Sequence, residues 1–371
     1  MALSGYLRED GVVGFRNLVV VVSMSDLAND VALRITARVH TAICFLTPTG
    51  GLSVGEELER VRRLRSAMCT NPNVGAVLVI GPDQKELERL FAGVRESGRP
   101  CDVLNLLNAV DSESAVLQGV RSAEHLTQSL RSQCRTNVDL GVLRVGIRSS
   151  SSSVDSAETV NPVIGNVVDF IVSSGGAVAF TELADMVGEL ESVAARGASE
   201  RISSLIRAAL GDVRNRLSTL APDAPDPTPT NKVGGLGTLE AKSRASLRRL
   251  GNRPINSVLQ FGDALPRVGL HMIAGPGSAA ISLVGFAAAG CNLVIYTIGM
   301  FSAIATCPLI PVVKVGPRKF ASSDDVDVCI TDNATQDDVL REVLAIADGK
   351  ASVTEQHQAR HLMIPNYLGP L

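Results

Sequence analysis

The first 150 residues alternate between short apolar runs and longer segments that mix apolar and polar residues at helical spacing. The first run, Asn17–Ser23, reads NLVVVVS, and a helix-length segment that ends near Val39 follows it. The same order recurs along this part of the chain. We expect strands over 17–23, 41–46, 74–80, 101–107 and 140–145, and helices over 26–39, 54–69, 85–97 and 112–134. This alternation predicts a parallel, doubly wound sheet with right-handed crossovers.

The remaining residues also combine strand and helix patterns. We expect a helix over 162–174, a strand over 177–180, a long helical region over 182–217 that breaks at Gly197 and Gly211, and a late helix over 337–347. A proline-rich stretch over 222–229 has the composition of a linker. The 371 residues are enough for two domains. The predicted fold class is α/β: a Rossmann-like parallel doubly wound domain over 1–150, then a second α/β domain over 151–371.

A long segment without charge, Met272–Val313, raises the alternative of a membrane span. Glycines and prolines interrupt this segment, and lipid penalises broken backbone pairing. Parallel strands that are covered on both faces are also uniformly apolar. We therefore expect a buried helix near 278–290, buried strands near 292–298 and 310–315, and no association with a membrane.

Composition limits the partners and the compartment. The formal net charge is −3 and no basic block occurs, so a nucleic-acid partner is not expected. A small anionic ligand would need only a local positive region. The seven cysteines are scattered and form no CxxC pair, which indicates a reducing compartment. The opening MALSGYLREDG carries charges where a signal peptide needs an apolar run, so we expect a cytoplasmic protein.

The most distinctive short segment is Asn231–Ser243, which reads NKVGGLGTLEAKS. Its glycines permit a tight turn close to a ligand, and Thr238 can cap a helix that begins at Leu239. The free N–H groups at such a helix start attract anions, and Lys232 and Lys242 would add positive charge. The segment lacks the Gly-Lys-Ser/Thr of a Walker loop. A tight turn before a surface helix explains the pattern about as well.

Five serines follow Arg148 and have two interpretations. Composition alone predicts a flexible connector. Parallel sheets bind ligands at the carboxyl ends of their strands, and this run would follow the fifth strand of the N-terminal sheet. In that interpretation the run donates hydroxyl groups to an anion, and Ser152 is the candidate.

These segments resemble, in order along nearly the whole chain, the signatures of the altronate/galactarate dehydratase family, which includes the large subunit of sulfolactate sulfo-lyase. NKVGGLGTLEAKS resembles GNKxGGLTTIEEKS, and the opening GYLREDGVVGFRN resembles GYxRxDGRxGxRN. Shorter similarities are HTAIC from His40 to HxxGC, NPVIG from Asn161 to NPxxG, TELAD from Thr181 to ETPE, and PVVKV from Pro311 to PxIKV. The small SAF-type domain of the dehydratases is absent from this sequence, and in two-subunit members it is a separate chain.

The resemblance implies a metal-dependent lyase, using iron or manganese, that removes water or sulfite from a small hydroxy or substituted carboxylic acid. Such an elimination needs a base for the proton next to the carboxylate, positive charge or metal for the enolate, and an acid for the leaving group. The Asn231–Ser243 loop would lie close to this anionic substrate, in a cleft with His40. Catalytic candidates are His40, Lys232, Lys242 and Glu182, with Asp185 nearby; substrate-binding candidates are Asn231, Gly234, Gly235, Thr238, Ser243 and Ser152; metal-ligand candidates are His40 and Cys44.

The same residues also have simpler interpretations. His40 is equally compatible with an ordinary polar residue at a helix end. Cys44 is compatible with a small buried hydrophobic residue. Without the resemblance, Lys232 and Lys242 would be interpreted as surface lysines.

Several polar residues of the family signatures are missing, which leaves two functional hypotheses. The cysteine of GLGCE is Gln84, the acid of a Gly-Ser-Asp loop is lost at Ser153, the aspartate of MDTPG is Ala274, and the threonine and arginine of FTTGRGS are Ile298 and Met300. The first hypothesis is a lyase whose site suits a less polar substrate. The alternative is a catalytically altered or inactive paralogue that keeps the scaffold for ligand binding or complex assembly. We expect a homo-oligomer, with a small SAF-type chain as a further partner.

Overall fold

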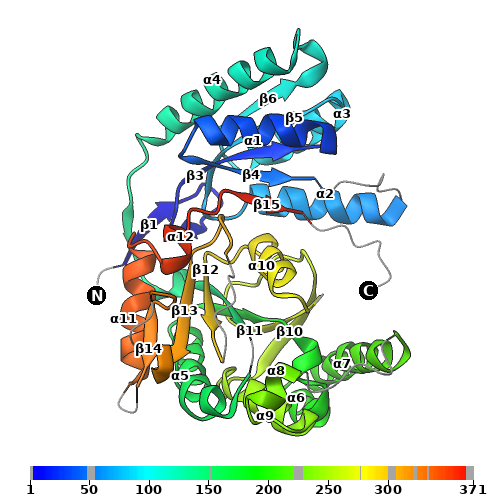
Figure 1. Ribbon diagram of the computed structural model, residues 1–371, viewed down its shortest axis with the longest axis vertical. Coiled ribbons are helices and arrows are strands. Elements are labelled where there is room, and N and C mark those ends of the chain that lie inside the picture. Colours follow the sequence, from blue (N-terminus) through cyan, green and yellow to red (C-terminus); the bar gives the residue numbers. More distant parts are fainter. Residues whose placement is uncertain are drawn as a thin grey trace.

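The computed structural model describes residues 3–47, 55–150, 152–220, 229–275, 277–299, 306–320, 324–331 and 334–364. Within these ranges, two large parallel sheets lie one above the other, and helices cover both faces of each sheet (Figure 1). The predicted α/β class with a parallel, doubly wound sheet is therefore confirmed.

The upper sheet in Figure 1 has the strand order β15-β4-β3-β5-β6. Its elements are β3 (Leu18–Ser23), α1 (Asn29–Arg38), β4 (Ala42–Leu46), α2 (Gly55–Cys69), β5 (Val74–Gly81), α3 (Gln84–Glu96), β6 (Cys101–Asn105), α4 (Ser112–Leu130) and β15 (His361–Met363). Apolar residues of α1 and α4 share one buried cluster with alternate strand residues, and those of α2 and α3 share another cluster with the opposite set. Because successive strand side chains point to opposite faces, a uniformly apolar run such as LVVVVS contributes to both clusters.

The strand predicted over 140–145 does not belong to this sheet. Leu140–Val142 forms a 3-10 turn, and the strand β8 (Arg144–Ser149) pairs with two strands of the second sheet. The fifth strand of the first sheet is instead β15, which follows the short helix α12 (Val353–Gln356) and pairs in parallel with β4. Local pattern does not fix the partners of a short apolar strand, because packing decides them. The division between the sheets therefore falls before β8 and not at residue 150.

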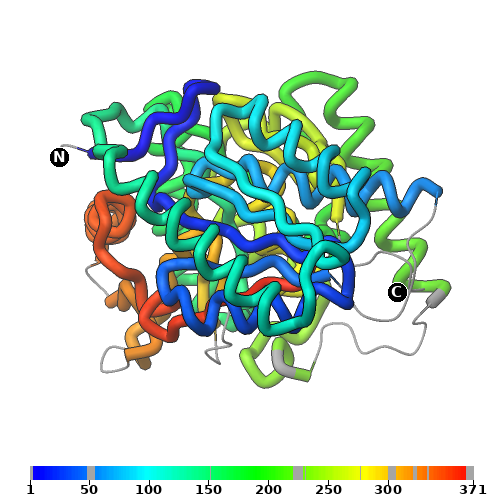
Figure 2. Tube along the Cα trace, turned by 90° about the horizontal axis from the view of Figure 1, so that it is seen from above, coloured from blue at the N-terminus to red at the C-terminus, as the bar shows by residue number. Residues whose placement is uncertain are grey.

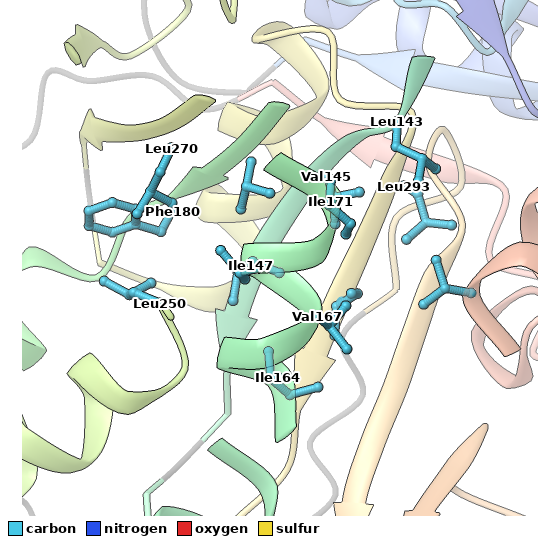
Figure 3. Packing of buried hydrophobic residues seen from close by; sticks show 14 of the residues in the cluster. Leu143, Val145, Ile147, Ile164, Val167, Ile171, Phe180, Leu250, Leu270 and Leu293 are labelled. Atoms are coloured by element: carbon cyan, nitrogen blue, oxygen red, sulfur yellow. The ribbon is translucent and has the colours of Figure 1, made fainter. Parts of the chain in front are cut away.

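The second sheet has seven parallel strands in the order β10-β11-β9-β8-β12-β13-β14. Besides β8, these are β9 (Ala177–Phe180), β10 (Ile255–Gln260), β11 (Gly269–Ala274), β12 (Leu293–Thr297), β13 (Val312–Pro317) and β14 (Val328–Ile330). Helices α5 (Asn161–Ser173) and α11 (Gln336–Ala347) cover one face, and α10 (Ala279–Ala288) covers the other. Figure 3 shows the α5 face, where Ile164, Val167 and Ile171 pack toward Val145 and Ile147 of β8.

The uncharged segment Met272–Val313 forms the predicted buried helix and strands. Helix α10 lies within 278–290, β12 lies within 292–298, and β13 begins at Val312. None of the helices in the described ranges combines the length and the apolar character needed to cross a bilayer.

A small antiparallel sheet, β2-β1-β7, pairs the N-terminal strand with the segment that connects the two large sheets, and it lies beside α11. Its strands are β1 (Leu3–Leu7), β2 (Val13–Gly14) and β7 (Thr136–Val138). The Ser4 backbone N–H and hydroxyl both donate to Asp348 Oδ1, at 3.1 and 2.6 Å, directly after α11. Figure 2 shows the blue N-terminal strand beside the orange-red helix α11.

Buried asparagines connect the two large sheets. Asn73 Nδ2 donates to the carbonyl oxygens of Asn292 and Leu309, each at 3.1 Å, and Asn71 Nδ2 donates to the carbonyl oxygen of Cys291 at 2.9 Å. One apolar cluster surrounds these contacts and includes residues of α2, α3, α10 and both sheets. The two sheets therefore share a core.

Between β9 and β10 the chain forms a helical extension near the lower end of the second sheet in Figure 1. It contains two 3-10 turns, η5 (Leu183–Asp185) and η6 (Val187–Glu189), and four helices, α6 (Leu190–Ala194), α7 (Glu200–Leu220), α8 (Pro229–Val233) and α9 (Leu239–Arg248). The predicted break at Gly211 is wrong because α7 continues through it; one glycine in a helix costs only about 1 kcal/mol. Most of the predicted linker over 222–229 lies outside the described residues.

Candidate functional site

The carboxyl ends of β8, β9 and β12 meet where the strand order of the second sheet changes direction. From β8 the chain passes through α5 to β9 on one side, whereas β12 leads to β13 on the other side. Adjacent loops at such a point leave a crevice in which parallel sheets bind ligands. The helical extension reaches this edge through its last helix, α9.

A buried carboxylate, Glu182, forms the centre of this edge. It follows β9 in a left-handed conformation with φ of 74°, and only 2% of the residue is exposed. Its Oε1 forms an ion pair with Arg148 Nη1, and its Oε2 accepts from Arg249 Nη2 at 2.7 Å and from the Ser149 N–H at 3.1 Å. Two cations and a backbone donor therefore occupy both carboxylate oxygens of Glu182. This arrangement is better suited to holding the two arginines in place than to accepting a proton.

Helix α9 contributes a stripe of polar residues to the same edge. Lys242, Ser246 and Arg249 follow one another at i, i+4 and i+7, so they lie along one face of the helix, and all three are buried. Lys242 Nζ lies 3.0 Å from Asp185 Oδ1, and Arg249 Nη2 lies 3.9 Å from Asp185 Oδ2. Thr238 caps the helix through its Oγ1, which accepts from the Ala241 N–H at 3.1 Å, as the sequence predicts.

Burial changes the electrostatics of the two arginines. It lowers the pKa of Arg148 to about 10, although the charges of Asp185 and Tyr296 partly oppose this effect. Burial also lowers the pKa of Arg249, and Asp185 again opposes it. With a pKa of about 10, Arg148 keeps its charge at neutral pH. A buried cation is stabilised by every anion placed beside it, so this edge favours anionic ligands.

Four buried donor atoms at this edge have no hydrogen-bond partner within the described part of the chain. They are Arg148 Nε, Arg249 Nε, Arg249 Nη1 and Tyr296 Oη, and Ser246 Oγ in α9 is also unpaired. Buried polar groups are nearly always hydrogen-bonded, because burying a donor without an acceptor is costly. The arginine atoms can only donate, so acceptor oxygens of a ligand would satisfy them.

The glycine-rich loop packs beside this cluster, at the second sheet. Asn231 Oδ1 accepts from the Ser152 N–H at 3.3 Å, and the Gly234 carbonyl accepts from the Val154 N–H at 2.9 Å. Gly235 has φ of 86°, and a Cβ there would lie 2.9 Å from Val154 Cγ2. The structure therefore brings Asn231 and Gly234 to the serine run. We expected the serine run at the N-terminal sheet, and this expectation is wrong because β8, which precedes the run, belongs to the second sheet.

His40 and Cys44 lie away from this cluster. His40 is exposed between α1 and β4, at the amino end of that strand, and its Nδ1 accepts from Arg360 Nη1 at 2.6 Å. Cys44 is buried inside β4, where Thr36 Oγ1 donates to its Sγ at 3.7 Å and burial raises its pKa. Figure 1 shows α1 and β4 in the upper half and α8 and α9 in the lower half, so the predicted cleft between His40 and the loop is not formed.

The described ranges contain no group of three or more His, Cys, Asp or Glu side chains that could hold a metal ion. His40 and Cys44 point to different surroundings, one exposed and one buried in an apolar cluster. The side chains that the structure describes therefore do not supply the iron or manganese site that the resemblance implies.

The other candidate residues take separate places. Lys232 is exposed on α8, whereas Lys242 is buried. Ser243 Oγ accepts from the Gly188 N–H at 3.1 Å and so attaches α9 to η6. Ser153 pairs with Ser156 rather than with a ligand.

The positions where family signatures lose polar residues are also dispersed. Gln84 is exposed at the edge of the first sheet, where its amide contacts Glu88 and Asn105. Ala274 ends β11, and Ile298 is fully buried in the apolar cluster between the sheets. Met300 lies outside the described residues.

Sequence reasoning missed Arg148, Arg249 and Tyr296 as site residues. Arg148 follows an apolar strand and directly precedes the serine run, which was a usable signal. Arg249 and Tyr296 gave none, because one follows another arginine in a charged helix and the other stands in an apolar strand. Only the pairing of distant segments brings them to Glu182.

The chain is thus an α/β protein with a buried polar cluster at the carboxyl edge of a doubly wound sheet, the edge at which such proteins bind ligands. Two family models match nearly the whole chain: D-galactarate dehydratase/altronate hydrolase, second domain, over residues 5–131, and D-galactarate/altronate dehydratase, C-terminal, over residues 140–368. The chain belongs to the D-galactarate/altronate dehydratase family, and the resemblance in the sequence is confirmed.

Three curated relatives show the extent of the similarity. Altronate dehydratase of Bacillus subtilis (strain 168) is 27% identical over 84% of this chain and 64% of its own length. Altronate dehydratase of Escherichia coli (strain K12) is 25% identical over 97% and 76%, and (2R)-sulfolactate sulfo-lyase subunit beta of Chromohalobacter salexigens is 27% identical over 88% and 85%. The chain thus spans less than two thirds of the first of these relatives.

Proposed function

We propose that this protein is a lyase that eliminates water or another small leaving group from a hydroxy or substituted carboxylic acid. The relatives named altronate dehydratase and sulfolactate sulfo-lyase support this class of reaction. The observation that carries the proposal is the set of unpaired donors on Arg148 and Arg249 beside the buried Glu182. These donors suit the carboxylate of such a substrate, because carboxylate oxygens accept several charge-assisted hydrogen bonds.

In this proposal, Arg249 binds the substrate carboxylate through Nε and Nη1, which have no acceptor among the residues that the structure describes. As the proton on the α-carbon leaves, negative charge grows on the carboxylate oxygens, and fixed donors stabilise that charge. Glu182 keeps both guanidinium groups in place through its two ion pairs. Its role is therefore to position the arginines.

We assign proton transfer to Lys242 and Asp185, whose side chains lie 3.0 Å apart next to Arg249. The substrate carries a hydroxyl group on C2 and the leaving group on C3; one proton moves from C2 to this pair, the C2–C3 double bond forms, and a C3 hydroxyl takes up one proton from the pair and leaves as water, while the C2 hydroxyl stays. The resulting enol becomes a 2-oxo acid. No step is assigned to a metal, since the described side chains do not form a ligand set.

A second candidate function is ligand binding without turnover. The saturation of Glu182 by Arg148, Arg249 and the Ser149 N–H favours it, because a carboxylate held in this way is a poor base. We also propose that the substrate is a small anion. We further propose a small partner chain, since the relative from Chromohalobacter salexigens is named a subunit.

The test compares Arg249→Lys with Arg244→Lys, a matched change on the exposed face of α9. Purified variants are incubated with altronate, galactarate or (2R)-sulfolactate, and 2-oxo acid formation is measured. We expect Arg249→Lys to lose about 100-fold in kcat/KM, as for removal of other fixed oxyanion donors, and Arg244→Lys to keep full activity. Ligand-induced stabilisation without any 2-oxo acid would favour the second function.

A further inference from the structure

Three polar residues form a row across the face of the second sheet that α10 covers. Arg148 of β8 stands in register with Tyr296 of β12, and Tyr296 stands in register with Lys314 of β13. Side chains at directly paired positions of neighbouring strands lie on the same face, about 4.8 Å apart. Tyr296 and Lys314 are at most 1% exposed, and Arg148 is 7% exposed.

The described contacts of Tyr296 explain its aromatic ring but not its hydroxyl group. Its ring packs within the apolar cluster that α10 and the strands form between the two sheets. Its hydroxyl is buried and has no hydrogen-bond partner among the described residues. A phenylalanine would fill the same space without burying a polar atom that no described residue pairs with, so we expect the hydroxyl to serve a ligand.

Arg148 presents an unpaired donor on the same face. Its Nη1 pairs with Glu182 and its Nη2 donates to the Gly277 carbonyl at 2.8 Å, but Nε has no acceptor. Gly277 directly precedes Ser278, the cap of α10, so the positive end of a helix dipole lies beside Arg148. A Cβ built at Gly277 would meet no atom within 4 Å, which leaves open space at this point.

We propose that Tyr296 Oη and Arg148 Nε form an oxyanion subsite on the α10 face, which binds a carboxylate or similar anionic oxygen group of the ligand. Burial raises the pKa of the Tyr296 hydroxyl, so it stays a donor at neutral pH. Lys314 is the next residue in the row and adds a buried cationic group beside it. The inference rests on the proposed function and deepens it, because it names ligand contacts of Tyr296 and Arg148 in addition to those of Arg249.

The test is Tyr296→Phe, which removes one oxygen atom and keeps the ring. The matched control is Tyr6→Phe, the same change in β1. Thermal stability is measured for each protein alone, with sulfate, and with galactarate. We expect Tyr296→Phe alone to be as stable as the wild type or more stable, and to bind sulfate and galactarate about tenfold more weakly, the loss expected for a hydrogen bond to a charged group.

A second readout uses tyrosine fluorescence, because the chain has three tyrosines and no tryptophan. Sulfate or galactarate is expected to change the emission of the wild type and of Tyr6→Phe, but not of Tyr296→Phe. Three results would overturn the subsite: a clear loss of stability in Tyr296→Phe alone, an equal response of Tyr296→Phe and wild type, or no response of the wild type to either anion. If sulfate binds through Tyr296 but galactarate does not bind, the subsite stands and the proposed lyase function loses its substrate class.

Discussion

The two sheets have the same parallel, doubly wound construction, but their carboxyl edges differ. At the first sheet, Gln84 and Asn105 are short, partly exposed polar residues that pair with each other at 2.8 Å. At the second sheet, Arg148, Glu182 and Arg249 are buried and joined by ion pairs. The helical extension between β9 and β10 makes the difference, because α9 covers the second edge and excludes water from it. Both sheets have a carboxyl edge with polar residues, but only at the second sheet does a helix, α9, bury these residues and so strengthen the interactions between their charges.

The largest expected effect comes from Glu182→Gln, which keeps the shape and removes the charge. Two buried guanidinium groups would lose their common carboxylate, so we expect a loss of about 3–5 kcal/mol in the free energy of unfolding, the range for a broken buried ion pair. Urea denaturation measures this loss. The control is Glu88→Gln at the edge of the first sheet, where the side chain is exposed and little change is expected. Equal effects would contradict the contrast between the two edges.

The next effect concerns the shared core. Asn73 Oδ1 accepts from the Phe15 N–H at 2.8 Å, and its Nδ2 donates to two carbonyl oxygens of the second sheet. Asn73→Ala would leave these buried backbone groups unpaired, so we expect a loss of about 2–3 kcal/mol. Unfolding followed by calorimetry should remain a single transition if the sheets form one cooperative unit. Two separate transitions in the wild type would show that the sheets unfold independently.

A smaller effect is expected in the glycine-rich loop. Gly235 has positive φ and a close neighbour in Val154, so Gly235→Ala should destabilise the protein by about 1 kcal/mol and weaken ligand binding. Gly237 offers the matched control, because a Cβ there meets nothing within 4 Å and its φ is not in the positive range. Gly237→Ala should be neutral. If both variants behave alike, the contact between this loop and the serine run has no energetic role.

These contrasts also explain what the sequence predicts. Apolar alternation is a local property, so it identified β3, β5, α5 and β9 within a few residues, and it located the buried helix α10. Thr238 was found because capping depends on neighbouring residues. Membership of a sheet is not local, and β8 was therefore assigned to the wrong sheet.

The candidate site was predicted in part for the same reason. Glu182 and Lys242 were named, but their surroundings were not, since Glu182 and Arg249 are 67 residues apart in the chain. His40 was chosen from its spacing to Cys44, yet His40 is exposed and Cys44 is buried in an apolar cluster, so the two side chains do not form one site. Tyr296 is indistinguishable from a core aromatic until its hydroxyl is seen without a partner. Where a site is formed by residues that are far apart in the sequence, its chemistry is seen only in the three-dimensional structure.

The smallest expected effect is a change in how the free energy of unfolding depends on pH, and it concerns a histidine of the second sheet. His271 of β11 is 1% exposed, and burial lowers its pKa below the usual value of 6.5. The unfolded chain therefore takes up a proton near pH 6.5, whereas the folded chain takes it up only at lower pH. The contribution of His271 to stability is thus present above pH 6.5 and is lost as the pH falls through the folded pKa. We expect His271→Gln to reduce the loss of stability between pH 7.5 and 5.5. We expect His40→Gln, at an exposed position beside the first sheet, to leave the proposed lyase activity unchanged. If His40→Gln abolished activity, His40 would act at the site after all, and its separation from the Glu182 cluster would be wrong.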